Sequence, residues 1–204
     1  MSSRVALDEA LELLASGRVV AVPTDTVYGV AASLGQPGAV EALFSLKLRP
    51  ASLALPVLVD SVDQIEALGV HFTTRARRLA ATFWPGALTI IVSAPDDLAR
   101  RLGSATRSVG FRIPDDALLR SLLTRSGPLA VSSANEHGHD PCHSAAQVLE
   151  LFAHREELAG VLDGGTRAGS VSTVVDLSRG QWLVVRPGAI TIERLTSVLG
   201  DNAR

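Results

Sequence analysis

Residues 19–29 read VVAVPTDTVYG, a short apolar run followed at once by two threonines and an aspartate. The run from Val19 to Val22 has the length and composition of a buried β-strand, and Pro23 ends it. In open α/β sheets, ligands bind at the ends of such strands. The polar segment 24–26 therefore has two interpretations: it belongs to a binding site, or it is an Asp/Thr turn that caps the next segment.

Helical and extended patterns alternate on both sides of this stretch. Apolar residues at three- and four-residue spacing indicate helices, and short β-branched runs indicate strands. We expect helices at about 5–15, 37–44, 62–68, 73–83, 115–123, 143–152 and 192–199. We expect strands at about 19–22, 55–59, 88–92, 108–113, 129–132, 160–162, 172–176 and 182–185. The polar stretch 96–107 should be the most mobile loop.

The interleaved pattern predicts an α/β fold with helices layered on a mixed sheet, because some neighbouring strands have hairpin-length connections. The length of 204 residues fits a single domain over residues 1–204. We find no internal repeat and no convincing linker.

Composition narrows the class of protein. The chain is 47% hydrophobic and 20% charged, has no apolar run of about 18 to 20 residues, and carries acidic residues where a signal peptide would be apolar. We expect a soluble cytoplasmic protein without membrane contact. The formal net charge of -2 means that any site for a polyanion must be local. The single cysteine, Cys142, excludes an internal disulfide framework.

Two cations, Lys47 and Arg49, follow a predicted helix and precede Pro50. They could simply complement the helix dipole at an exposed helix end. In an extended segment, however, residues at i and i+2 project to one side. That geometry would let Lys47 and Arg49 grip one polyphosphate, with a bidentate contact from the arginine.

Further polar groups follow later strands. Ser133 and Asn135 share the same i, i+2 relation after an apolar run, and they fit either phosphate binding or a turn. A fourth group combines residues 163–165 and 172–176 with Arg186, where glycines allow close approach and Ser172 and Arg186 offer anion donors.

No nucleophile stands out in this chain. It contains no GxSxG, no GxxxxGK[ST] and no paired carboxylates on one face, which argues against hydrolase and P-loop functions. The remaining Lys, Arg, Ser, Thr and Asn side chains indicate a site that binds phosphates and a small polar substrate, and that acts by positioning and charge stabilisation.

Seven motifs in order carry a family resemblance. They are PTDTVYG at 23–29, KxRP at 47–50, FWPGALT at 83–89, VGFRIP at 109–114, SAN at 133–135, STVVD at 172–176 and RPGA at 186–189. Their order and spacing, over about residues 5–198, resemble the YrdC-like family of threonylcarbamoyl-AMP synthases.

The resemblance implies a twisted α/β sheet around a large basic cavity. It implies a nucleotidyltransferase that condenses L-threonine, bicarbonate and ATP, with Mg²⁺, into threonylcarbamoyl-adenylate and pyrophosphate. A partner transferase would then modify adenosine in tRNA.

The resemblance also assigns residues. The catalytic set is Lys47, Arg49, Ser133 and Asn135. The threonine site is Thr26, Tyr28, Arg112 and Ser172, and the ATP site is Arg49, Ser108, Ser133 and Arg186. No protein residue is assigned to a metal.

This chain departs from the family pattern at several positions. Leu48 replaces a common glycine, Leu53 and Ala54 stand where a polar or basic residue and a proline are usual, His137 replaces a serine, and Ala87 replaces a frequent proline. Leu53 matters most, because a candidate ATP contact is lost.

Two alternative functions remain. One is a module that binds double-stranded RNA or tRNA through Arg75, Arg77, Arg78, Arg100 and Arg101, which could equally be solvated surface arginines. The other is a carbamoyl-adenylate-forming relative that uses carbamoyl phosphate, which a chain of this length makes less favoured.

A group of potential zinc ligands lies just after the SAN motif: His137, His139, Cys142 and His143. One short loop rarely closes a tetrahedral shell, and neighbouring Cys142 and His143 would have difficulty facing the same ion. We therefore expect a polar loop at the rim of the nucleotide cavity, with no structural metal.

Overall fold

The computed structural model describes residues 2–47, 54–136 and 139–200. Its helices are α1 (Leu7–Ala15), α2 (Ala39–Lys47), α3 (Val62–Ala67), α4 (Thr74–Phe83), α5 (Asp96–Arg101), α6 (Ala117–Ser126), α7 (Ala145–Leu151) and α8 (Ile192–Leu199). Its strands are β1 (Ser3–Val5), β2 (Val19–Pro23), β3 (Tyr28–Ser33), β4 (Val57–Leu58), β5 (Leu88–Ser93), β6 (Ser108–Arg112), β7 (Leu129–Ser133), β8 (Leu158–Leu162), β9 (Thr173–Asp176) and β10 (Leu183–Arg186).

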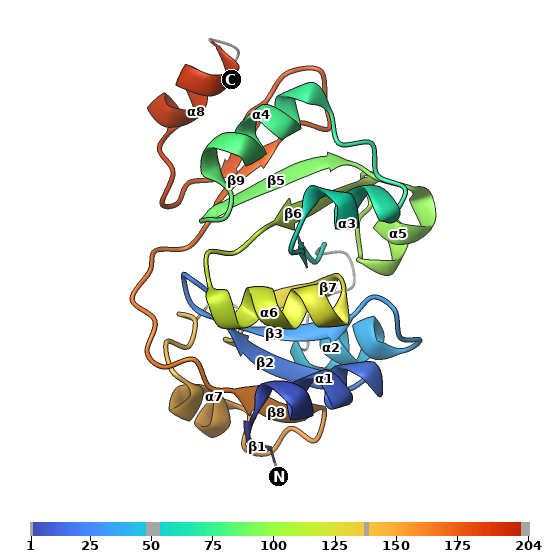
Figure 1. Ribbon diagram of the computed structural model, residues 1–204, viewed down its shortest axis with the longest axis vertical. Helices are drawn as coiled ribbons and strands as arrows, with labels where there is room; N and C mark the ends of the chain where they lie inside the picture. The colour runs from blue at the N-terminus through green and yellow to red at the C-terminus, as the bar shows by residue number, and fades with distance from the viewer. Residues whose placement is uncertain (1, 48–53, 137–138, 201–204) are drawn as a thin grey trace.

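In the described part of the chain, the strands form one mixed sheet in the order β1-β8-β2-β3-β7-β4-β6-β5-β9-β10 (Figure 1). The sheet contains parallel pairs, such as β2 with β8, and antiparallel pairs, such as β2 with β3. The predicted single α/β domain with a mixed sheet is confirmed.

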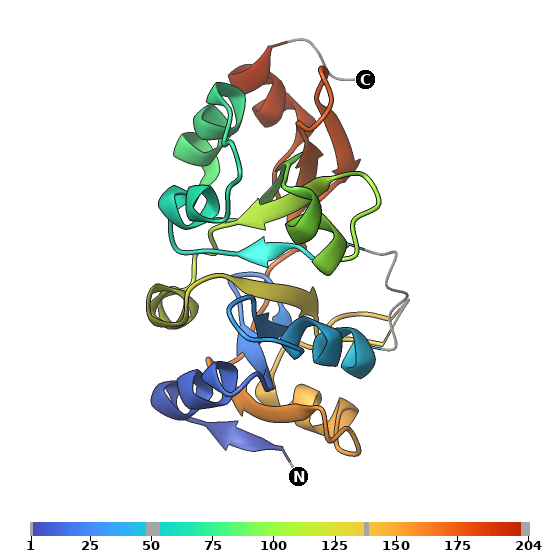
Figure 2. The ribbon, with the colours of Figure 1, turned by 90° about the vertical axis from the view of Figure 1, so that its right-hand side faces the viewer.

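Alternating residues of the strands face two hydrophobic clusters, as the two-residue period of a strand requires. Val20 and Val22 of β2 pack with α1 and α6 on one face. Val19 and Ala21 belong to the larger cluster, to which α2 and α7 contribute from the opposite face (Figure 2). Helices therefore cover both faces of the sheet, as predicted.

Two strands were not predicted. We expected the first helix to begin near residue 5, but Ser3–Val5 forms β1, beside β8, and α1 begins only at Leu7. The segment Tyr28–Ser33, rich in small residues, forms β3 between β2 and β7. Glycine and alanine have low strand propensity, so hydrogen bonding on both edges determines this strand rather than local preference.

The prediction of a loop over 96–107 was wrong for its first half, which is α5. Asp96 and Asp97 lie in the first turn, and Arg100 and Arg101 lie in the last turn, so both ends complement the helix dipole. Leu98 is buried against the core. Acidic residues in the first turn and basic residues in the last turn favour a helix in a stretch that is polar in composition.

None of the helices in the three described ranges has the length and apolar character that a membrane span requires.

Candidate functional site

The turn between β2 and β3 is built around Thr24. Its Oγ1 accepts hydrogen bonds from the backbone N–H groups of Thr26 and Val27 (both 3.1 Å), and donates to the carbonyl of Val27 (2.7 Å). Thr24 and Thr26 are both buried, with their hydroxyl oxygens 2.9 Å apart. The Asp/Thr turn considered from the sequence is therefore present, and it sets the position of Thr26.

Arg112, at the end of β6, is fixed by three groups. Nε donates to the carbonyl of Gly86 (2.9 Å), Nη1 donates to Oγ1 of Thr26 (3.4 Å), and Nη2 pairs with the Asp25 carboxylate (2.5 Å). The side chains of Arg112 and Asp25 are only 7% and 14% exposed. A buried arginine needs such a partner, because an uncompensated charge in the interior is costly.

Ser172 and Arg186 complete this group from the other end of the sheet. Nη2 of Arg186 donates to the carbonyl (2.8 Å) and to the hydroxyl (2.9 Å) of Ser172, whose Oγ lies 3.0 Å from Oγ1 of Thr89. Burial, and to a smaller extent the charge of Arg112, lower the pKa of the Arg186 guanidinium. The two arginines thus share one site.

We call Asp25, Thr26, Arg112, Ser172 and Arg186 the arginine cluster. The cluster contains two guanidinium groups and one carboxylate, so it keeps an excess of positive charge. Thr26, Arg112 and Ser172 are buried, whereas Arg186 is exposed. Such an arrangement suits a small ligand that carries a carboxylate and a polar side chain.

A second group, the lysine cluster, comprises Lys47, Ser133 and Asn135. Nζ of Lys47 donates to the Ser133 carbonyl (2.8 Å), to Oδ1 of Asn135 (2.8 Å) and to the Asn135 carbonyl. Oγ of Ser133 donates to the same Oδ1 (2.7 Å). The ammonium is therefore held at the end of β7 by its hydrogen bonds to this turn.

The pairing of β3 with β7 connects the two clusters. Ser133 lies opposite Gly29, three residues after Thr26, and the N–H of Ala134 donates to the Tyr28 carbonyl (2.9 Å). The sheet thus places a site for a carboxylate beside a cation suited to phosphate.

Two residues assigned to the ATP site, Ser108 and Arg186, have other contacts in the structure. Ser108 is at the start of β6, four residues from Arg112, and contacts Thr106 (2.9 Å between hydroxyl oxygens). The registers of β6 and β7 against β4 place the start of β6, with Ser108, and the end of β7, with Ser133, on the same side of the sheet's strand ends. Arg186, assigned to ATP, contacts Ser172 of the predicted threonine site instead.

Tyr28 is fully buried, and its hydroxyl is engaged by the segment after β8. It donates to the Gly165 carbonyl (2.8 Å) and accepts from the Gly164 N–H (3.0 Å). Burial raises the pKa of this phenol, since the anion would be poorly solvated. Tyr28 directly follows the turn of residues 24–27, which we call the threonine loop, and its hydroxyl holds the segment after β8.

Some predicted residues lie outside the described ranges. These are the proposed phosphate ligand Arg49 and the departures Leu48, Leu53 and His137. Ala54 is described and is exposed ahead of β4.

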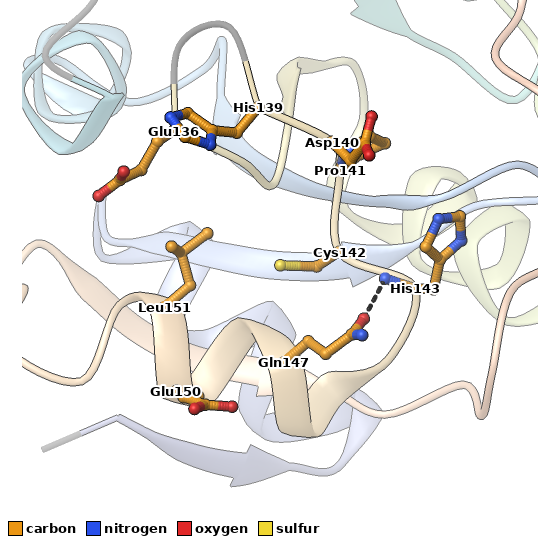
Figure 3. Close-up of a pocket in the computed structure, with 9 residues that line it drawn as sticks. All are labelled: Glu136, His139, Asp140, Pro141, Cys142, His143, Gln147, Glu150 and Leu151. Atoms are coloured by element: carbon orange, nitrogen blue, oxygen red, sulfur yellow. Dashed lines mark hydrogen bonds between the residues drawn. The ribbon is translucent and has the colours of Figure 1, made fainter.

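A pocket of about 490 Å³ adjoins the lysine cluster (Figure 3). Asn135 Nδ2 donates to the carbonyl of His139 on its rim (2.6 Å). Its lining includes the carboxylates Glu136, Asp140 and Glu150, so the pocket is not the basic cavity expected from the resemblance.

The described candidate zinc ligands, His139, Cys142 and His143, do not form a metal site. Cys142 and His143 point in different directions (Figure 3), and Nδ1 of His143 lies 2.9 Å from the Arg167 carbonyl. Within the described ranges, no three His, Cys, Asp or Glu residues are arranged to hold a metal ion. Burial raises the pKa of the Cys142 thiol, although the nearby Lys47 charge acts in the opposite direction.

A model of the Sua5_yciO_yrdC family, described as "Telomere recombination", matches residues 12–188. The chain belongs to this family.

Relatives within the Sua5_yciO_yrdC family support the assignment along nearly the whole chain. A Mycobacterium tuberculosis relative is 39% identical, with 95% of this chain and 89% of the relative covered. The threonylcarbamoyl-AMP synthase of Bacillus subtilis is 37% identical, with 94% of this chain but 56% of the relative covered.

Among solved structures, Pyrococcus abyssi Sua5 complexed with L-threonine superposes with a TM-score of 0.88 at 31% identity. The match covers all of this chain and 61% of the archaeal chain. This chain thus spans little more than half of the Bacillus and Pyrococcus proteins. Escherichia coli YciO, at 21% identity and a TM-score of 0.84, shares the fold.

Asp25 and Thr89 were given no role from the sequence. Asp25 is part of the PTDTVYG motif, and Thr89 is the last residue of the FWPGALT motif. For Asp25 the available signal was Arg112: a buried arginine requires a carboxylate, and Asp25 is next to Thr26, which was assigned to the same site as Arg112.

Proposed function

We propose that this chain is a threonylcarbamoyl-AMP synthase, a nucleotidyltransferase that condenses L-threonine, bicarbonate and ATP to threonylcarbamoyl-adenylate and pyrophosphate. The observation that carries the proposal is the arginine cluster, in which Arg112 is held between Asp25 and Thr26 and Arg186 is bonded to Ser172. The relative from Bacillus subtilis has this name, and the Pyrococcus relative was solved with threonine.

In this proposal, Arg112 receives the threonine carboxylate as a charge-assisted hydrogen-bond donor. Thr26 and Ser172 then orient the amino acid through their hydroxyl groups. Neither hydroxyl needs to react, because the threonine amine is itself the nucleophile. It adds to bicarbonate with loss of water and gives a carbamate.

The carbamate oxygen then attacks the α-phosphate, and the bond to pyrophosphate breaks. Lys47 supplies positive charge where negative charge develops, which is the general way in which preorganised donors lower such barriers. Arg49 would act with it. Ser133 and Asn135 hold the ammonium in place through the contacts described above.

Mg²⁺ enters this scheme as part of the ATP substrate. The described residues present no cage of carboxylates, and Mg²⁺ commonly binds through substrate phosphates and water. We propose a cytoplasmic enzyme whose product passes to a separate transferase that modifies tRNA.

The RNA-binding alternative gains no specific support. Among its arginines, Arg77 pairs with Glu66, and Arg75 and Arg101 donate to the carbonyls of Gly180 and Gln36. These contacts are what solvated surface arginines make.

The test is pyrophosphate release with each substrate omitted in turn. Release should require threonine, bicarbonate, ATP and Mg²⁺ together. Equal turnover without threonine would refute the proposal. Turnover with carbamoyl phosphate instead would favour the carbamoyl-adenylate-forming relative. RNA binding with a steep salt dependence but no turnover would favour the RNA-binding module.

A further inference from the structure

The connection from β8 to β9, residues 163–172, runs past the arginine cluster, and we call it the strap. It runs along one side of the molecule between strands far apart in the sheet (Figure 1). Six strands lie between β8 and β9, so a flat sheet would require a span of about 34 Å. Ten extended residues reach about 35 Å. The strap contains no helix or turn.

The strap lies directly against the threonine loop. The N–H of Gly169 donates to the Thr26 carbonyl (3.2 Å). A Cβ at Gly169 would lie 2.5 Å from the Asp25 carbonyl oxygen and 2.8 Å from Cα of Thr26, so only glycine permits this approach. At its far end the strap supplies Ser172 to the arginine cluster. The position of the strap therefore determines two sides of that cluster.

Arg167 anchors the middle of the strap. Its Nη2 pairs with Oδ2 of Asp116 (2.9 Å), and the two side chains are only 18% and 8% exposed. Its own N–H donates to the His143 carbonyl (2.8 Å). Nε of Arg167 is buried without a hydrogen-bond partner in the described structure. Burying this donor costs free energy that a solvent-exposed arginine would not lose.

Asp116 gives this anchor a rigid base. Its Oδ1 accepts from the N–H of Leu119 (2.8 Å) as the N-cap of α6, which leaves Oδ2 for Arg167. Asp116 also follows Arg112 by only four residues, between the end of β6 and the start of α6. The ion pair thus ties the strap to the segment that presents the carboxylate-binding arginine.

We infer that Arg167, held by Asp116, is a positioning residue for the threonine site: it keeps the strap seated so that Thr26, Ser172 and Arg112 stay in register. The inference rests on the proposed function in one respect: its kinetic test measures KM for threonine and for ATP. Arg167 acts through the strap and touches none of the reacting atoms.

The experiment compares Arg167→Leu, Arg167→Lys and Asp116→Asn. Asparagine still caps a helix, so Asp116→Asn removes the charge while α6 keeps its N-cap. Arg167→Leu and Asp116→Asn should each raise KM for threonine about tenfold, since small displacements of positioning groups have large effects. KM for ATP should stay within about twofold of wild type. Arg167→Lys should recover part of the loss, and the Leu/Asn double variant should be no worse than either single variant.

The matched control is Arg4→Ala. Arg4 pairs with Asp163 at the start of the same strap (3.0 Å), but its side chain is 60% exposed. An exposed ion pair contributes little, so both KM values should stay unchanged.

A second measurement needs no substrate. Amide hydrogen exchange at Gly169, whose N–H is bonded to Thr26, should accelerate in Arg167→Leu and Asp116→Asn but not in Arg4→Ala. Active variants with an unchanged ratio of the two KM values and unchanged exchange would overturn the inference alone. A folded wild-type protein without threonine-dependent turnover would overturn the proposed function as well.

Discussion

The buried pair of Asp25 and Arg112 allows a quantitative prediction. Asp25→Asn keeps the size of the side chain and one acceptor oxygen, but removes the charge that compensates the guanidinium. Breaking a buried pair from one side typically costs about 3–5 kcal/mol. Because Arg112 keeps its contact with the Gly86 carbonyl, we expect the lower end, about 3 kcal/mol.

The assay is urea unfolding followed by tryptophan fluorescence. With a urea m-value of about 3 kcal/mol/M, the midpoint of Asp25→Asn should fall by about 1 M. Asp96→Asn is the control: its pair with Arg107 is solvent-exposed, and together with the charge lost from the first turn of α5 the change should lower the midpoint by no more than about 0.3 M. A loss below about 1 kcal/mol in Asp25→Asn would refute the reasoning, since the pair would then be screened like a surface pair.

Three further predictions follow from the site. The chain has a single tyrosine, so phenolate absorbance at 295 nm reports Tyr28 alone. The pH midpoint of this absorbance change in the folded protein should lie above the ordinary pKa of 10.0, because burial raises the pKa of Tyr28. Tyr28→Phe should abolish the signal. Stability from this shift is present below pH 10 and is lost as pH rises through the raised pKa, which alkaline unfolding would measure. Cys142 should react slowly with a disulfide reagent at pH 8, because burial raises the pKa of its thiol. The reaction should be slower still in Lys47→Met, which lacks the lysine charge that lowers this pKa. Faster reaction in the variant would contradict this. Lys47→Ala should reduce pyrophosphate release by about 10² or more, and a folded variant with the wild-type rate would exclude the assigned role.

Much of the fold was predictable because local and global signals agree. The strand at 19–22 is apolar and bounded by proline, and the structure extends it by one residue as Val19–Pro23. Strand β3 was missed because its glycine and alanines carry no local strand signal. Strand β1 was missed because three residues acquire a strand partner only from β8, far along the chain.

The site was predictable as residue types at strand ends, and less so as contacts. Thr26 bonds to Arg112, Ser172 bonds to Arg186, and the charges of the two arginines influence each other. Lys47 bonds to the Ser133 carbonyl and to Asn135. The partners that hold them were not predicted, because Asp116 and Arg167 lie 51 positions apart and carry no motif that links them. Ion pairs between distant segments become visible only when the chain path is known.

The sheet order has a consequence for how the protein is made. Strand β1 pairs only with β8 within the described residues, and Ser3 faces Gly160, 157 positions later. Strand β2 has β8 as its outer neighbour too, so this edge of the sheet cannot close until Leu158–Leu162 has left the ribosome. Long-range pairing of this kind slows folding, because loop-closure entropy is lost before the contacts form. Strand β1 therefore has no strand partner until then, and its unpaired hydrogen-bonding groups are open to pairing with other chains.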